Sequence, residues 1–339
     1  MKQRNIVLDF LRILAAVEIF LMHLTLFVPE EVGNQTFAFL SKISSRGANG
    51  VAILFCLSGY LIFSGLFDGG TDWKTYFRKR IMRIVPVYYL VLMLYLAVGL
   101  LPRDAGVLRY FFFVNGLVPS GNYAVYNNVG GFWSMGCFLL WYLIAPWLAR
   151  RVKSLRTSLV MLAGMFVAGK IIKLVLRVLY IMVNADAIDF MVDNNPFGNL
   201  YFFGTGVVAY FLIKEAKSTE GIFVCMLGIT FLTVINSPWY FFWMLLAVVF
   251  ILLSGQVEIS LPYGKRCIAF LSDISFALYL VHLGVIELMD ATGIQDSCGS
   301  LVFAVVTTAV VFLCTMCVYA VDRFIFQRLL FSMEQKSSI

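Results

Sequence analysis

Residues 6–28 read IVLDFLRILAAVEIFLMHLTLFV, a long apolar run that carries Asp9, Arg12, Glu18 and His23. A run of this length crosses the hydrocarbon core of a bilayer as one α-helix, for which ~20 residues suffice. Similar runs recur along the chain, which is 61% hydrophobic and 13% charged over 339 residues. Globular proteins are only about 45–50% apolar and about 25% charged. The composition therefore predicts a multi-pass membrane protein and excludes a water-soluble domain.

Ten apolar segments are expected to cross the membrane as helices. They fall near residues 6–28, 48–67, 84–101, 132–149, 157–182, 197–213, 221–236, 238–255, 267–289 and 300–321. Most of the 26 lysines and arginines then lie in loops on one side, the side of both termini, and positively charged loops face the cytoplasm. We therefore expect an all-α polytopic membrane protein with about ten transmembrane helices. Both termini are expected to be cytoplasmic, in the cell (inner) membrane.

Residues 1–339 are expected to form a single membrane domain, because no internal repeat, long linker or soluble domain interrupts the apolar segments. The net charge of +7 does not indicate a nucleic-acid partner, since the basic residues are spread over the loops. The loops 102–131 and 184–199 are expected to face outward. The first mixes aromatic residues with Asn, Gly and Ser, which suits either contact with sugars or an aromatic belt at the membrane interface.

Arg12 and His23 lie at membrane depth, where an ionisable side chain is costly and usually functional. They are 11 residues apart, which is ~20° beyond three full helical turns, so they share one face of the first helix. Asp9 lies three residues before Arg12 and can pair with it. Glu18 points elsewhere and is expected to meet another helix. Taken singly, Arg12 could instead snorkel to the headgroups, and His23 could be a structural histidine.

The second histidine of the chain, His282, lies in FLSDISFALYLVHLG of the span 267–289. If this helix runs outward, as the first one does, both histidines lie at similar depth in the outer half of the membrane. Histidine titrates near neutrality and can move protons in a transfer reaction. No H-x-x-x-H or Cys/His spacing is present, so we expect no metal site.

A basic stripe runs along the span 157–182. Lys170, Lys173 and Arg177 stand at i, i+3 and i+7, within ~60° of one helix face. The stripe indicates either a structural partner, such as Glu18, or an anionic ligand.

Four stretches together resemble the acyltransferase 3 family of multi-pass membrane O-acyltransferases. LDFLRILAAVEIFLMH gives an Arg-x10-His pattern, and GANGVAILFCLSGYLIF contains the Phe-x-x-Ser-Gly-(Phe/Tyr)-Leu-Ile signature. RKRIMRIVPVYY and ISFALYLVH match the third and fourth motifs. The residues that carry the match are Arg12, His23, Gly50, Val51, Phe55, Ser58, Gly59, Tyr60, Arg80, Arg83, Pro86, Tyr88, Ser275, Tyr279 and His282.

The resemblance implies a cytoplasmic acyl-CoA donor, such as acetyl-CoA, and a carbohydrate acceptor at the outer face of the bilayer. It implies His23, Arg12 and His282 as catalytic residues, with His23 as general base. Arg12, Arg78, Arg80 and Arg83 are expected to bind the donor. Ser58, Tyr60, Trp133, Ser134, Lys170 and Lys173 are expected to bind substrates, and Ser58, Trp133 and His282 are candidate donors to the oxyanion. No bound cofactor is expected, and the sequence leaves the oligomeric state open.

One position departs from the family pattern. The family usually has Trp-Ser-Leu-x-x-Glu, and here the segment reads FWSMGCFLLWYLIAPW, with Phe138 in place of the glutamate. The leading hypothesis is an O-acyltransferase that moves an acyl group, with acetyl preferred, from acyl-CoA to a hydroxyl of a cell-envelope or surface glycan. The alternative is a membrane transporter or polysaccharide-export partner that keeps the fold without acyl transfer.

Overall fold

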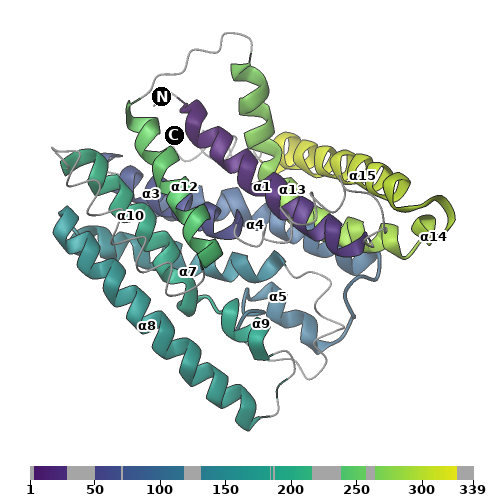
Figure 1. The fold of residues 1–339 in the computed structure, drawn as a ribbon, viewed down its shortest axis with the longest axis horizontal. Coiled ribbons are helices and arrows are strands. Elements are labelled where there is room, and N and C mark those ends of the chain that lie inside the picture. Colours follow the sequence, from purple (N-terminus) through teal and green to yellow (C-terminus); the bar gives the residue numbers. More distant parts are fainter. Residues whose placement is uncertain are drawn as a thin grey trace, which may run out of the picture.

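The computed structural model describes residues 4–28, 50–69, 72–117, 131–183, 185, 188–215, 238–256 and 264–326 (Figure 1). Every regular element among these residues is helical, so the predicted all-α fold is confirmed. Part of the loop 102–131 lies outside them, since residues 118–130 are not described.

The long helices are α1 (Ile6–Phe27), α3 (Gly50–Gly69), α4 (Trp73–Ala97), α7 (Trp133–Arg151), α8 (Leu155–Met182), α10 (Leu200–Glu215), α12 (Pro238–Gln256), α13 (Lys265–Asp290) and α15 (Ser300–Val321). The short helices are α5 (Leu108–Phe111), α9 (Ile188–Asp193) and α14 (Ile294–Cys298). Two 3₁₀ turns, η2 (Ala105–Val107) and η4 (Phe197–Asn199), and a π-helical turn, η5 (Asp322–Phe326), complete the described elements.

Seven described helical segments are long and apolar enough to cross a membrane, which supports a multi-pass membrane protein. They are Ile6–Phe27, Gly50–Asp68, Trp73–Ala97, Leu155–Met182, Phe197–Glu215, Gly264–Asp290 and Ser300–Phe326. Helices α7 and α12 coincide with two further predicted spans, and the span 221–236 lies outside the described residues. The count of ten spans and the side of the termini stay predictions.

Helix α4 begins at Trp73, well before the predicted span 84–101. Asp72 caps it, since its carboxylate accepts hydrogen bonds from the backbone N–H groups of Lys74 and Thr75. The apolar pattern locates only the part of α4 that can lie in hydrocarbon. The basic segment 73–83, which the hydropathy pattern leaves out, forms the first turns of the same helix.

The long helices pack side by side in an order that differs from their order in the sequence (Figure 1). α10 packs extensively against α3 and α8, and α1 packs extensively against α13. α15 lies beside α13, while α12 contacts α1, α3 and α10. α1 is therefore surrounded by α3, α12 and α13, which places its polar residues inside the bundle.

Two glycines allow α3 and α10 to approach backbone to backbone. A Cβ atom on Gly59 would overlap the carbonyl oxygen of Phe203, and one on Gly206 would overlap that of Cys56. Small residues serve this purpose between helices in membranes, where van der Waals packing drives association. Beside this contact, the ring of Phe55 stacks on that of Phe203 with centroids 4.5 Å apart. The packing is tight at the centre of the bundle.

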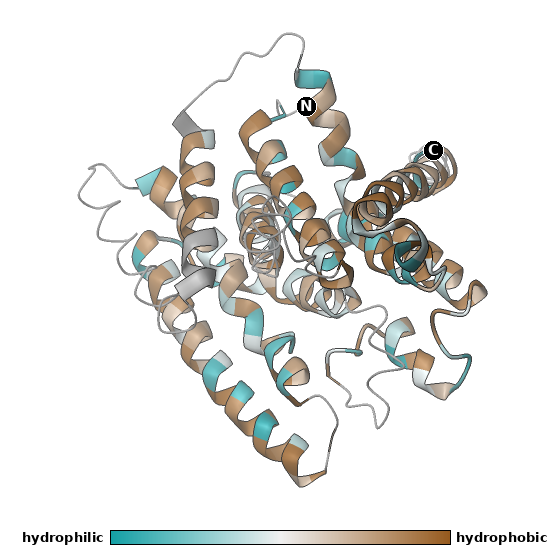
Figure 2. Ribbon diagram, turned by 45° about the vertical axis from the view of Figure 1, so that its right-hand side comes forward, coloured by the Kyte–Doolittle hydropathy of each residue, from teal (hydrophilic) through white to brown (hydrophobic). Residues whose placement is uncertain are grey.

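Helix α8 lies at the edge of the bundle, and only 17% of its most apolar window is buried. Its outer face exposes large hydrophobic side chains, among them Val160, Val167, Ile171, Leu174 and Val178. Figure 2 shows that hydrophobic residues predominate along the long helices, with hydrophilic residues at intervals. An apolar face of this kind is stable against lipid tails and unstable in water.

Candidate active site

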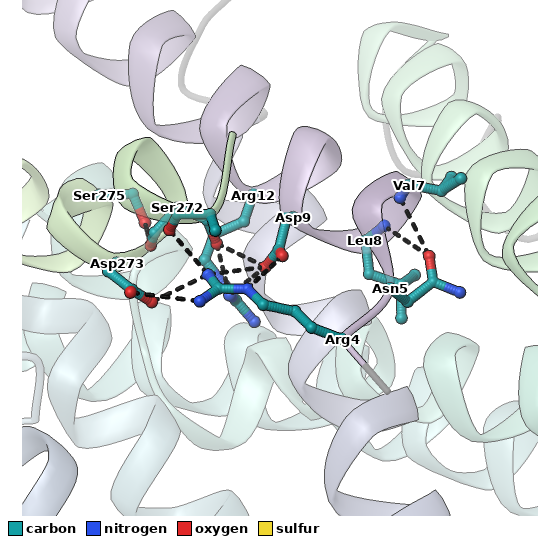
Figure 3. Close-up of polar contacts among 10 residues, drawn as sticks. Arg4, Asn5, Val7, Leu8, Asp9, Arg12, Ser272, Asp273 and Ser275 are labelled. Atoms are coloured by element: carbon teal, nitrogen blue, oxygen red, sulfur yellow. Dashed lines mark hydrogen bonds and ion pairs between the residues drawn. The ribbon is translucent and has the colours of Figure 1, made fainter. Parts of the chain in front are cut away.

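A buried polar network joins the first turns of α1 to α13 (Figure 3). Asp9, which is 5% exposed, forms ion pairs with Arg4 and Arg12. Ser272 of α13 donates to Asp9 Oδ1 over 2.7 Å and accepts from Arg12 Nη1 over 2.8 Å. Arg4 also pairs with Asp273 at 2.9 Å. Asp9 and Ser272 therefore fix the Arg12 guanidinium, as the i, i+3 spacing of Asp9 and Arg12 predicted.

Arg12 lines a cavity of about 100 Å³, here called the Arg12 cavity. Arg80 and Arg83 of α4 line it as well, so three guanidinium groups surround one small space. The side chains of Ser58, Phe138, Ser275 and Tyr279 also line this cavity. Arg78 is not among the lining residues, because it stands ~200° around α4 from Arg80. Arginine clusters of this kind favour phosphate and carboxylate groups.

The two histidines are in contact. His282 Nε2 lies 3.1 Å from His23 Nδ1, and the ring centroids are 4.9 Å apart. Each Nδ1 also lies close to a carbonyl oxygen one turn earlier, that of Ile19 for His23 (2.9 Å) and that of Leu278 for His282 (3.0 Å). The two histidines therefore lie at a similar depth along the bundle, as predicted.

These contacts favour one tautomer of each imidazole. A carbonyl oxygen only accepts hydrogen bonds, so both Nδ1 atoms carry the proton. His23 Nδ1–H is then shared between the Ile19 carbonyl and the lone pair of His282 Nε2. His23 Nε2 keeps its lone pair and forms no hydrogen bond with a described residue. With these tautomers, His282 Nε2 accepts from His23, and a role of His282 as a donor to the oxyanion would need the other tautomer.

Helices α1 and α13 run parallel. Arg12 meets Ser272 near one end, and His23 meets His282 farther along. The two intervals are 11 residues on α1 and 10 residues on α13, or ~16 Å and ~15 Å of helix. The two helices therefore stay in register from the arginine to the histidines.

His23 lines a second and larger cavity of about 540 Å³, here called the His23 cavity. Trp133 of α7 lines it, as do Asp193 at the end of α9 and Asn199 of η4. Tyr279, Leu283 and Glu287 of α13 form another part of its wall. A cavity that combines an imidazole, an indole, amides and carboxylates can bind a polyhydroxylated molecule.

Tyr279 lines both cavities. Its hydroxyl lies 2.9 Å from the Gly131 carbonyl oxygen and 2.8 Å from Ser134 Oγ, and Ser134 Oγ donates to the same carbonyl over 3.0 Å. Tyr279 and Ser134 are both buried. These three groups, here called the Tyr279 partition, form part of the wall between the two cavities.

The structure brings only some of the predicted substrate residues to the cavities. Ser58 lines the Arg12 cavity and Trp133 lines the His23 cavity. Ser134 contacts Tyr279 at the partition. Tyr60 lines neither cavity, and its ring faces Tyr210 with centroids 6.4 Å apart.

The basic stripe of α8 contacts residues of α9 and of α8 itself. Lys173 lies 3.7 Å from Asp193, and Arg177 lies 2.6 Å from Asp189. Lys170 lies over the ring of Phe166. Glu18, named above as a candidate partner, is buried, and its carboxylate makes no hydrogen bond with the described part of the chain. Lys173 and Arg177 thus tie α8 to α9 by ion pairs. Lys173 does not itself line the His23 cavity, but its partner Asp193 does.

Phe138 lines the Arg12 cavity, although the family pattern has a glutamate at this position. Its ring packs against Phe55 and Phe203 with centroids 5.0 Å and 5.6 Å apart. Phe138 therefore makes the wall beside the three arginines apolar.

Sequence reasoning missed Asp193 and Glu287 as cavity residues. Tyr279, Leu283 and Glu287 stand at i, i+4 and i+8, so they share one face of α13 beside the face that carries His282. This spacing was a usable signal for Glu287. Asp193 ends a short helix that only tertiary packing places at the cavity, so no local pattern indicates it.

The profile of a protein family described as an acyltransferase domain, Acyl_transf_3, matches residues 5–320. The chain is also similar to a protein of Acidianus two-tailed virus named "Putative acetyltransferase ORF330". The two are 27% identical over 274 residues, which cover 75% of this chain and 77% of the viral protein. No solved structure matches the chain significantly.

Proposed function

Because the chain belongs to the acyltransferase 3 family, we propose that it is an O-acyltransferase of the cell membrane that uses acyl-CoA. It moves an acyl group, with acetyl preferred, to a hydroxyl of a cell-envelope or surface glycan. One observation carries the proposal: a cavity rich in arginine and a cavity rich in polar and aromatic groups share Tyr279, and the second contains His23.

The Arg12 cavity suits the donor. Arg12, Arg80 and Arg83 supply positive charge for the phosphates of acyl-CoA, and Arg12 is held by Asp9 and Ser272. A pantetheine arm is long and narrow, and its length is comparable with the ~16 Å along α1 from Arg12 to His23. The arm can therefore bring the thioester to the histidines while the nucleotide stays near α4. In this orientation the N-terminal end of α1 faces the cytoplasm.

The chemistry begins at His23 Nε2. This atom takes the proton of the acceptor hydroxyl as the oxygen attacks the thioester carbonyl carbon. The C–S bond then breaks, and His23 returns the proton to the thiolate of CoA. His282 Nε2 accepts from His23 Nδ1–H and so stabilises the imidazolium that forms in between. Ser58 and Trp133 stay candidates for donors to the oxyanion, since each lines one of the cavities.

The test uses purified protein in proteoliposomes with radiolabelled acetyl-CoA added on the side of the N-terminus. Label transferred to extracted envelope glycan is followed for wild type, His23→Ala and Val17→Ala. Val17 lies on the same helix, is 38% exposed and lines neither cavity. We expect a loss of ~10²–10⁴ for His23→Ala and wild-type rates for Val17→Ala. Wild-type protein that transfers no acetyl or succinyl group but supports glycan export would instead favour the transporter hypothesis.

A further inference from the structure

Glu287 extends a stripe on α13 into the His23 cavity. It follows Tyr279 and Leu283 at intervals of four residues, and all three line the cavity. Its Oε2 atom is buried and has no hydrogen-bond partner among the described residues. A buried carboxylate oxygen without a partner is costly unless a ligand supplies the missing donor. Glu287 therefore presents an unused hydrogen-bond acceptor at the cavity wall.

The charge of the cavity distinguishes Glu287 from Asp193. Besides Tyr279, the described titratable lining residues are His23, Asp193 and Glu287. Asp193 is balanced by Lys173 at 3.7 Å. Glu287 has no such ion pair among the described residues. Among the described residues, no cation at the wall would balance the charge of Glu287 when it is ionised, so an anionic ligand beside it would meet repulsion.

The position of Glu287 relative to the histidines suits a sugar. It follows His282 by five residues, which is ~7.5 Å along the axis of α13. This rise is comparable with the width of one pyranose ring with its hydroxyls. Trp133, on the wall formed by α7, offers an aromatic face for the apolar side of such a ring. A carboxylate can then accept hydrogen bonds from two hydroxyls, or from an ammonium group.

We propose that Glu287 is an acceptor-binding residue that selects a neutral or amine-bearing sugar and rejects anionic sugars such as uronic acids. This inference rests on the proposed function, since it assigns the His23 cavity to the acceptor. It adds the charge class of the sugar and a binding residue on α13.

The test measures binding, so it does not depend on acyl transfer. Radiolabelled dodecyl glycosides of glucose, glucosamine and glucuronic acid differ in charge and keep the same ring. Their dissociation constants are measured on the protein in nanodiscs for wild type, Glu287→Gln, Glu287→Lys and Asp290→Asn. Asp290 is exposed, lies on the same helix and does not line the cavity, so it is the matched control. Thermal unfolding checks that each variant is folded.

Wild type is expected to bind the glucoside and the glucosaminide at least tenfold more tightly than the glucuronide. Glu287→Gln should reduce that ratio to within about twofold, and Glu287→Lys should reverse it, while Asp290→Asn keeps it. Binding of none of the three glycosides by wild type, or an unchanged ratio in both Glu287 variants, overturns the inference. Loss of acetyl transfer with intact selectivity in binding would instead count against the proposed function alone.

Discussion

Replacing Asp9 by alanine should destabilise the protein far more than the same change at Asp273. Both carboxylates pair with Arg4, but only Asp9 also reaches Arg12 and Ser272. Asp9 is 5% exposed, whereas the side chains of Arg4 and Asp273 are both 40% exposed. The burial of Asp9 therefore makes its contacts stronger, because water competes less for them.

The magnitude follows from this difference. Removing one partner of a buried ion pair costs about 3–5 kcal/mol, since the other charge is left without compensation. Arg4 keeps Asp273 and part of its hydration, so the lower end, about 3 kcal/mol, applies to Asp9→Ala. An exposed pair such as Arg4–Asp273 contributes about 0–1 kcal/mol.

The assay is the free energy of unfolding from SDS titration in dodecyl maltoside micelles, measured for wild type and the two variants. Initial rates with varied acetyl-CoA give a second readout. Asp9→Ala should also raise the KM for the donor, because Arg12 loses the group that orients it. Equal losses of stability in the two variants, or an Asp9→Ala protein with wild-type stability, would refute the assignment of Asp9 as the organising residue of the network.

Three further changes test separate parts of the structure. Arg83→Gln should raise the KM for acetyl-CoA at least tenfold, whereas Arg78→Gln, outside the Arg12 cavity, should change it less than twofold in proteoliposome rate measurements. Gly59→Ala should cost about 1–3 kcal/mol in SDS titration because its Cβ overlaps a backbone carbonyl of α10. Gly164→Ala, with nothing within 4 Å, should gain up to about 1 kcal/mol. Phe138→Glu should raise the KM for acetyl-CoA severalfold by placing a carboxylate among three arginines, and an unchanged KM would contradict that placement.

Helical geometry made one part of the site predictable. The interval between Arg12 and His23 places both on one face, and both side chains indeed contact the same neighbour, α13. The membrane topology predicted that His282 lies at the depth of His23. A helical period and a charge bias are local signals, so the sequence alone carries them.

Other parts depend on packing between distant segments. Nothing near Tyr60 indicates that it faces Tyr210, while Ser58, two residues earlier, lines a cavity. The partners of Lys173 and Arg177 lie on α9, a helix of six residues that hydropathy does not detect. The shared proton of His23 and His282 also depends on the orientation of two rings, which no spacing determines.

The Tyr279 partition has a consequence for the energy balance of the cell. In the proposed orientation the two cavities open to opposite sides of the membrane. The contacts of Tyr279 with Ser134 and Gly131 would then block the passage of ions between them. On the proposed mechanism, an acyl group would cross this point in every turnover, whereas protons must not, because a proton leak would dissipate the membrane potential. Tightness to ions therefore limits how wide the passage between donor and acceptor can become. The protein must be a barrier as well as a catalyst.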